Sequence, residues 1–416
     1  MMKNKKDLNL KRLKKNVKGI TLIALVVTVI VLLILAGVAL SLTVGDNGLF
    51  RRAQNAADTW QMAEQNEQSE IEQAGNFLDD YTSEYNKATT VAYAKQLNKA
   101  FEKNTLIKDD LGNEVMIPAG FKIASDSATL VENGIVIEDS DENQFVWIPS
   151  RTEDKGGAII KLFSGETTTI IYKRTVYSTN IDSGEIDEET NSEKIIQSST
   201  IDHYYTEAMP TDEVESINEN GGYYIGRYEA GDKESTEAKT MRRGSITSQE
   251  NTITIKKDQT PYDRITYTNA KKKAEEMDTV QGYTTATTKL VSSYAWDTAI
   301  SFIQISNSDY GNNSPEGNYL NTKFDYIDIT GVEQTKNSGE GTLVPTGQTT
   351  AVSNIYDMGG NAWEFTTESY SNVDYVYSAR GSDWHNNYDS RPAGFRGSAD
   401  GLSYNNGAFR VTLYLK

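Results

Sequence analysis

Residues 19–44 form an uninterrupted uncharged stretch, GITLIALVVTVIVLLILAGVALSLTV, which restricts the possible structures of this chain more than any other feature. A single segment can cross a membrane only as a helix, because a helix satisfies all of its own backbone hydrogen-bonding groups. At about 1.5 Å per residue the stretch reaches past the roughly 30 Å hydrocarbon core. The preceding residues 2–18 carry eight Lys or Arg and one acid, Asp7. Because basic flanks stay in the cytoplasm, we expect a single-pass cell-membrane protein whose C-terminal part is extracellular.

Three interpretations of this segment compete. A cleaved secretory signal needs a shorter apolar core and a small-residue cleavage site after it, so the length argues against a signal. A plain signal anchor is the second interpretation. The third rests on KGITLI, residues 18–23, which resembles the K-G-[F/I]-T-L-I junction of type IV prepilins. This resemblance implies cleavage between Gly19 and Ile20 by a prepilin peptidase, with a basic leader at 1–19 and a pilin-like helix at 20–44.

One position departs from the pilin pattern. Type IV pilins usually carry Glu as the fifth residue after the cleavage site, where it pairs with a neighbouring subunit's N-terminal amine, whereas Ala24 stands here. A carboxylate inside lipid is costly and is kept only for a partner. The substitution therefore favours a minor pilin or a pilin-like membrane anchor over a subunit of a long filament. The partners that this resemblance implies are the membrane, other pilins and the prepilin peptidase.

Residues 45–104 are predicted to form an amphipathic helical stalk and a connector. Residues 82–104 are polar and mixed, and we interpret them as a short helix and the connector. In the stalk, apolar residues recur at spacings of mostly three and four, which places them on one face of a helix. We expect this face to pack on the protein's own domain or on a neighbouring copy. The recurring residues are Leu49, Ala53, Ala56, Trp60, Ala63, Ile71, Ala74, Leu78 and Tyr81.

Composition limits the chemistry of the rest of the chain. The formal net charge is −18 and the mean hydropathy is −0.56. An acidic chain lacks the basic face that neutralises phosphates, so we expect no nucleic-acid partner. There is no cysteine, which excludes disulfides, thiolate metal sites and cysteine nucleophiles. His203 and His385 are the only histidines, which argues against a His-based zinc site or a Ser-His-Asp triad.

Residues 105–416 are predicted to form an α+β domain, because short apolar runs bounded by Gly, Asn and Asp are mixed with a few helical segments. Helices are expected at 266–277, with Thr268 or Asn269 as the N-cap, and at 292–303. An acidic, polar insertion at 151–220 is interpreted as a solvated loop. Its acidic run at 181–193 leaves Ca²⁺ binding open but lacks the ligand order of an EF-hand. The expected strands are 115–123, 134–139, 145–149 and 222–230.

A series of motifs in this region occurs in a recognisable order. They are FVWIP (145–149), YYIGRYE (223–229), SYAWD (293–297), NIYDMGGNAWEF (354–365), ARGSDW (379–384) and GAFRV (407–411). The order is similar to that of the formylglycine-generating enzyme, or sulfatase-modifying factor, family and covers about residues 110–416. The resemblance implies a variant of the C-type lectin fold. It assigns a structural signature to Gly359, Gly360, Asn361, Trp363, Glu364, Arg380, Gly381, Phe409 and Arg410.

The signature residues suggest a framework role on physical grounds. Gly359 and Gly360 permit a tight turn with positive φ, and Asn361 can bond backbone groups within that turn. Trp363 and Glu364 fall on opposite faces of the strand that follows. We expect Glu364 to pair with a buried arginine such as Arg380 or Arg410. A role for Glu364 as a ligand group is the alternative.

Absent residues argue against an enzymatic role. Family members that make formylglycine use a pair of active-site cysteines to bind copper and activate oxygen, and this chain has none. Related members that act on sulfur compounds use an iron site with several histidine ligands. We therefore predict a non-catalytic protein without a cofactor, with Ca²⁺ left open. A membrane-anchored enzyme of this superfamily with another activity is the alternative, and stoichiometric copper or iron would favour it.

Residues 382–407 contain the candidate binding surface. SDWHNNYDSR (382–391) and SADGLSYNNG (398–407) are rich in Asn, Tyr, Asp and Ser, residue types that suit adaptable binding surfaces. Their placement resembles the variable proteins of diversity-generating retroelements, and ordinary polar loops are the alternative. We predict a cell-surface or pilus-associated adhesion protein that binds an extracellular protein or glycan. The predicted ligand-binding residues are Asp383, Trp384, His385, Asn386, Asn387, Tyr388, Tyr404, Asn405 and Asn406.

Overall fold

The computed structural model describes residues 22–44, 51–64, 66–68, 71, 90–153, 158–177, 185–186, 194–196, 203–234, 251–403 and 406–416. The chain divides into two compact units, Met1–Lys87 and Ala88–Lys416. The predicted leader with its Gly19–Ile20 junction, and Tyr404 and Asn405, lie outside the described residues. So does all of the acidic run 181–193 except residues 185–186, of whose side chains nothing is described.

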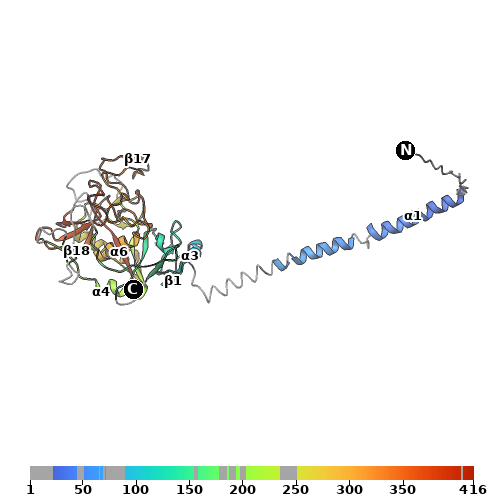
Figure 1. Ribbon diagram of the computed structural model, residues 1–416, viewed down its shortest axis with the longest axis horizontal. Coiled ribbons are helices and arrows are strands. Elements are labelled where there is room, and N and C mark those ends of the chain that lie inside the picture. The colour runs from blue at the N-terminus through green and yellow to red at the C-terminus, as the bar shows by residue number, and fades with distance from the viewer. Residues whose placement is uncertain are drawn as a thin grey trace, which may run out of the picture. The chain divides into compact units, whose positions relative to one another are not determined.

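The N-terminal unit contains helix α1, Leu22–Val44 (Figure 1). Within α1, Leu22–Leu40 has a mean hydropathy of 3.2 and is the one segment of the described chain long and apolar enough to cross a membrane. It is therefore a candidate anchor, and a signal sequence would look the same. Residues 51–64 and 66–68 are also helical, and Trp60 is 78% exposed. The prediction that the apolar face of the stalk packs on the protein's own domain or on a neighbouring copy therefore stays a prediction.

The C-terminal unit begins earlier than the sequence predicted. Helix α3, Val91–Leu97, is capped by Thr90, and its Val91 and Ala94 belong to the hydrophobic core of this unit. The expected boundary at residue 105 is therefore wrong. Two small apolar residues in a polar stretch give a weak signal, yet their spacing of three is enough to bury one side of a short helix.

Two sheets form the frame of this unit. The first has six antiparallel strands in the order β15-β22-β11-β5-β4-β3. They are β3 Lys122–Ile123, β4 Val136–Glu138, β5 Gln144–Pro149, β11 Gly222–Gly226, β15 Ala286–Leu290 and β22 Val411–Leu415. The second has the order β20-β19-β18-β10-β9-β8, with β21 parallel to β18. Its strands are β8 Glu185–Ile186, β9 Lys194–Ile196, β10 Tyr205–Thr206, β18 Trp363–Tyr370, β19 Tyr377–Arg380, β20 Arg396–Ala399 and β21 Gly407–Phe409.

Shorter elements surround these sheets. A two-stranded sheet joins β1 to β2, and two others join β6 to β7 and β16 to β17, while β12, β13 and β14 form a three-stranded sheet. The mixed helix and strand content of the prediction is confirmed. The bounds are β1 Thr105–Lys108, β2 Glu114–Ile117, β6 Ile159–Lys161, β7 Thr167–Thr169, β12 Gly231–Asp232, β13 Ile253–Thr254, β14 Thr260–Pro261, β16 Phe324–Ile327, β17 Glu333–Lys336 and the 3-10 helix η1 Val131–Asn133.

Helix α6, Ser293–Ile303, packs against both sheets. It contacts β5 of the first sheet and β18 of the second. All of its residues except Ser301 are buried, including the polar Ser293, Asp297 and Thr298. Ser292 caps it by accepting a hydrogen bond from the backbone N–H of Ala295 at 3.1 Å.

Helix α5, Tyr267–Gln281, begins at a different cap from the one predicted. Thr266 accepts the capping bond from the backbone N–H of Asn269, so neither Thr268 nor Asn269 is the N-cap. A threonine directly before the first helical residue can reach the third helical N–H, whereas Thr268 already lies inside the first turn.

The insertion at 151–220 is not simply a solvated loop, which corrects the prediction. It contributes helix α4, Thr211–Asn220, and Tyr172, Arg174 and Glu213 from it are buried. Glu213 accepts hydrogen bonds from the hydroxyls of Tyr172 and Tyr414, the latter at 2.9 Å. The polar composition of the insertion gave no sign of this helix or of these buried residues, because polar side chains can be buried where hydrogen-bond partners satisfy them.

Candidate functional site

The turn that precedes β18 uses its two glycines differently. Gly360 has φ of 73°, as predicted, but Gly359 is outside the left-handed region. A Cβ on Gly359 would lie 2.5 Å from the Tyr319 hydroxyl oxygen and 2.9 Å from the Glu316 carbonyl oxygen. Gly359 is therefore required by close approach rather than by backbone conformation.

Asn361 ties this turn to a distant segment rather than to itself, contrary to prediction. Its Oδ1 accepts from the backbone N–H of Val344 at 3.1 Å and from Nδ2 of Asn318 at 2.8 Å. Its Nδ2 donates to the Val344 carbonyl at 3.1 Å and to a carboxylate oxygen of Glu229. Asn361 is fully buried, so these partners replace the water that its amide would otherwise bind.

Glu364 pairs with Arg410, one of the two predicted partners. The Arg410 Nε and Nη2 atoms donate to the two carboxylate oxygens at 2.8 and 2.6 Å, a bidentate pair. Arg380, the other candidate, instead donates from Nη2 to Asp297 at 2.6 Å. Both arginines are completely buried, which gives Glu364 a framework role.

A cluster of buried charges lies in the second sheet and against α6. Glu368 of β18 accepts hydrogen bonds from the Nε atoms of Arg174 and Arg396, both at 3.1 Å. Arg396 and Arg380 also contact Asp297. Burial by itself would raise the pKa of Glu368, but the guanidinium groups of Arg396, Arg174 and Arg380 lower it to about 2. The cluster therefore holds three positive and two negative charges, each with a counter-ion.

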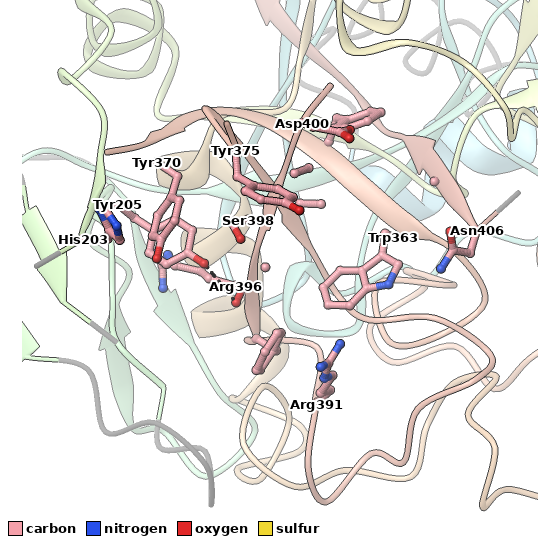
Figure 2. Close-up of a pocket in the computed structure, with 16 residues that line it drawn as sticks. His203, Tyr205, Trp363, Tyr370, Tyr375, Arg391, Arg396, Ser398, Asp400 and Asn406 are labelled. Atoms are coloured by element: carbon pink, nitrogen blue, oxygen red, sulfur yellow. Dashed lines mark hydrogen bonds between the residues drawn. The ribbon is translucent and has the colours of Figure 1, made fainter. Parts of the chain in front are cut away.

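A pocket of about 460 Å³ opens above this cluster, over strands β10, β18, β19 and β20 (Figure 2). This volume is in the range of small-ligand sites. Figure 2 shows Trp363, Arg391 and Asn406 on one side and His203, Tyr205 and Tyr370 on the other. The lining residues are His203, Tyr205, Trp363, Phe365, Tyr370, Tyr375, Ala379, Arg391, Phe395, Arg396, Gly397, Ser398, Ala399, Asp400, Asn406 and Gly407.

Aromatic rings form much of the pocket wall. The Tyr205 and Tyr370 rings lie 4.6 Å apart between centroids, and Trp363 lies 5.7 Å from Phe395. The Trp363 ring packs against Gly397, and a Cβ added to Gly397 would lie 2.9 Å from that ring. Gly397 thus lets the indole lie across the end of β20. Such rings offer flat apolar faces to a ligand.

Arg391 is a charged group of the pocket wall that has no counter-ion among the described residues. Its guanidinium carbon lies 5.6 Å from the Trp363 ring centre and 5.1 Å from that of Phe395. Across the described part of the chain, the Arg391 side chain has no hydrogen bond or ion pair. Ring faces therefore hold this guanidinium at the pocket while its N–H donors stay available.

Asp383 braces the Trp363 side of the pocket. Its Oδ2 accepts from the indole Nε1 of Trp363 at 2.9 Å and from Nδ2 of Asn406. Its Oδ1 accepts from the backbone N–H of His385 at 2.9 Å and from Nδ2 of Asn386 at 2.5 Å. The carboxylate is 1% exposed and has four donors, so it positions the wall rather than contacting a ligand.

The predicted binding residues do not form one face. Trp384 is 1% exposed, so its expected role in contacting a ligand is wrong. Its ring packs against Gly341, and a Cβ added to Gly341 would lie 2.8 Å from that ring. Of the described candidates, Asn406 alone lines the pocket.

The segment from His385 to Tyr388 packs elsewhere. The backbone N–H of Leu320 donates to the Asn386 carbonyl at 2.9 Å, and the Tyr388 ring lies 6.0 Å from that of Tyr319. His385 is exposed, whereas Asn386, Asn387 and Tyr388 are half-buried. This segment therefore packs near Tyr319 and Leu320 rather than at the pocket.

Sequence reasoning missed most of the pocket. Trp363 was predicted as framework only, and Tyr370, Tyr375 and Arg391 were not singled out. Tyr370 and Tyr375 flank a turn, and this recurrence of tyrosines near a signature strand was the available signal. Arg391 carried no signal, because its environment depends on rings contributed by β18 and by the segment before β20.

A second pocket of about 430 Å³ contains Glu207, Glu213 and Lys289. Glu207 accepts from the backbone N–H of Ser293 at 2.9 Å and from the Thr367 hydroxyl. Glu207 therefore satisfies an N–H in the first turn of α6, which is a structural task. No group of three or more acidic or histidine side chains that could hold a metal ion occurs within the described ranges.

The part of the chain that contains the turn before β18 and the buried ion pairs matches a known protein family. The family model of the sulfatase-modifying factor enzyme 1-like domain matches residues 172–413. A search of curated proteins found no match.

Three similar solved structures have low sequence identity. PvdO from Pseudomonas aeruginosa is 14% identical, with 67% of this chain and 98% of that chain covered and a TM-score of 0.35. CarF is 12% identical, with 59% and 97% covered and a TM-score of 0.34. Treponema denticola variable protein 1 is 12% identical, with 65% and 95% covered and a TM-score of 0.31.

Proposed function

The chain belongs to the sulfatase-modifying factor enzyme 1-like domain family, and from this premise we propose that it is a non-catalytic surface protein that binds an extracellular ligand. The ligand occupies the pocket over β10, β18, β19 and β20. Helix α1 anchors the protein in the cell membrane with the domain outside.

The pocket at Trp363 and Arg391 is the observation that carries this proposal. It combines aromatic faces with polar groups of Ser398 and Asn406, the usual composition of a recognition site. The copper-binding cysteines that formylglycine formation requires in the family are absent from the sequence. Arg396, which pairs with Glu368 in the buried cluster, forms part of the pocket lining.

For the N-terminal segment we propose a specific processing step. The junction at Gly19 and Ile20 is a prepilin peptidase site, and the cleaved protein is a minor pilin or a pilin-like membrane protein. Mass spectrometry of the protein from its native membrane should give an N-terminus at Ile20. An intact leader would contradict the processing proposal without affecting the binding proposal.

Binding is tested with the full chain in detergent on arrays of glycans, extracellular matrix proteins and bacterial envelope fractions. Tyr375→Ala and Asn406→Ala remove two side chains that line the pocket and should weaken binding at least tenfold. Lys323→Ala, an exposed residue outside the pocket, is the control and should bind normally. Binding that survives both pocket substitutions would contradict the proposed site.

The alternative of an unusual enzyme makes a different prediction. Metal analysis of the purified full chain by mass spectrometry would show stoichiometric copper or iron if the domain were a metalloenzyme of this superfamily. Either metal at one per chain would reverse the non-catalytic assignment. Bound Ca²⁺ would be compatible with it.

A further inference from the structure

Arg391 has an environment that points to a chemical class of ligand. The guanidinium lies over the Trp363 ring at 5.6 Å and over the Phe395 ring at 5.1 Å. These contacts hold the guanidinium at the pocket wall without using its N–H donors, and no carboxylate of the described chain pairs with it. A planar donor fork without a partner in the described chain is suited to bidentate binding of a carboxylate.

The other charged side chains at the pocket already have partners. The guanidinium of Arg396 contacts Glu368 and Asp297 and donates to the Thr175 carbonyl at 3.0 Å. Asp383 has four N–H donors, and Asp400 accepts from the backbone N–H of Leu402 at 2.9 Å. The positive charge of Arg391 is therefore the one that a ligand can complement.

The residues that line the pocket next to Arg391 are suited to a sugar ring that bears such a carboxylate. Trp363 is half-buried and Tyr375 is 48% exposed, and both line the pocket. The C–H face of a pyranose can pack on such rings. Ser398 and Asn406 line the same pocket and can bond hydroxyl groups. A volume of about 460 Å³ suits one or two such rings rather than a folded partner.

We infer that the pocket binds an acidic glycan, with Arg391 holding the carboxylate of a uronic or sialic acid residue. This inference rests on the proposed binding function and specifies its ligand class. The net charge of −18 opposes the approach of an anion, but at physiological salt this repulsion is screened beyond about 8 Å. The contact at Arg391 lies well inside that distance.

The test uses the full chain in detergent and a glycan array with matched pairs. The array carries oligogalacturonate and its methyl ester, sialylated glycans and their asialo forms, sulfated glycans, neutral glycans and a glutamate-rich peptide. We expect binding to carboxylated glycans and not to the methyl ester or the asialo forms. Arg391→Gln should weaken this binding by roughly 10- to 100-fold, and Arg391→Lys should weaken it less.

Matched controls separate binding from folding. Lys323→Gln makes the same change of charge outside the pocket and should bind like the unmodified protein. Thermal unfolding should show that Arg391→Gln remains folded.

Three results would overturn the inference. They are equal binding of a carboxylated glycan and its neutral form, unchanged affinity in Arg391→Gln, and a preference for sulfated glycans or the acidic peptide. Absence of glycan binding also overturns it. The proposed function fails separately, if no extracellular ligand of any class depends on Tyr375 and Asn406.

Discussion

Arg391 and Arg396 are five positions apart, yet they occupy opposite kinds of environment. Arg396 is 2% exposed, with Glu368, Asp297 and the Thr175 carbonyl around its guanidinium. Arg391 lies at the pocket wall against two aromatic rings and pairs with no acid of the described chain. The same residue type therefore forms part of the framework at one position and an available binding group at the other.

The difference shows how this fold separates stability from recognition. Buried charges are tolerated where every donor has a partner, because an unpaired buried charge is costly. Donors at a pocket wall can remain unpaired, because water satisfies them until a ligand arrives. Substitutions in the two regions should therefore affect different properties.

The largest effect is expected from Glu368→Ala. It leaves Arg174 and Arg396 without one counter-ion in the core, and breaking such a buried pair costs about 3–5 kcal/mol. Urea unfolding of the full chain measures this loss. Glu333→Ala, an exposed glutamate of β17, should change the unfolding free energy by less than about 0.5 kcal/mol. A small effect of Glu368→Ala would mean that the cluster is dispensable.

The buried acid Glu229 extends the comparison to the pH dependence of stability. Burial raises the pKa of Glu229 well above its usual value, and the neighbouring Asp357 and Glu364 raise it further. The folded state therefore holds the proton of this carboxyl to higher pH than the unfolded state does, and the resulting contribution to stability is complete at pH values below the unfolded pKa. As the pH rises from there towards the folded pKa, up to about 1.4 kcal/mol is lost per pH unit.

Glu229→Gln provides the matching test. The amide is neutral at every pH, so unfolding between pH 5 and 8 should depend less on pH than in the unmodified protein. The variant should be the more stable of the two at pH 8. An unchanged pH profile would show that the pKa of Glu229 is not raised in the folded state.

An intermediate effect is expected from Gly397→Ala at the edge of the pocket. The new Cβ would meet the Trp363 ring at 2.9 Å, and such overpacking typically costs about 1–3 kcal/mol. Because the indole would have to move, ligand binding should weaken as well. In a Trp363→Leu background the alanine should cost little, and a full cost there would point to a backbone effect instead.

The smallest stability effect is expected from Arg391→Gln. Its contacts with the rings of Trp363 and Phe395 are partly exposed, and such contacts contribute about 0.5–1 kcal/mol. Thermal unfolding should therefore change little while binding falls. A stability loss as large as that of Glu368→Ala would place Arg391 in the framework and remove the basis of the comparison.

The framework was predictable because it depends on local patterns. The motif NIYDMGGNAWEF predicted a turn followed by a strand, and the expected pairing of Glu364 with a buried arginine is confirmed for Arg410. The resemblance to the sulfatase-modifying factor family is confirmed as well. Both depend on residues whose type and spacing carry the signal.

The binding surface was predicted less well, for a physical reason. Residues 383–388 have the composition of a binding loop, but Asp383 and Trp384 are buried, and Asn386 and Tyr388 pack near Leu320 and Tyr319. Composition describes what side chains can do and does not say which way they point. Burial depends on segments that are distant in the sequence.

The sequence by itself determined the apolar N-terminal helix, the mixed α and β architecture, the family and the absence of cysteine chemistry. Each of these follows from composition or from local periodicity. Only the tertiary structure decided that Arg396 is neutralised while Arg391 is available, and that Trp363 rather than Trp384 faces the pocket. Those outcomes require α6, β18, β19 and β20 to come together, because the counter-ions and rings that define each site come from separate parts of the chain.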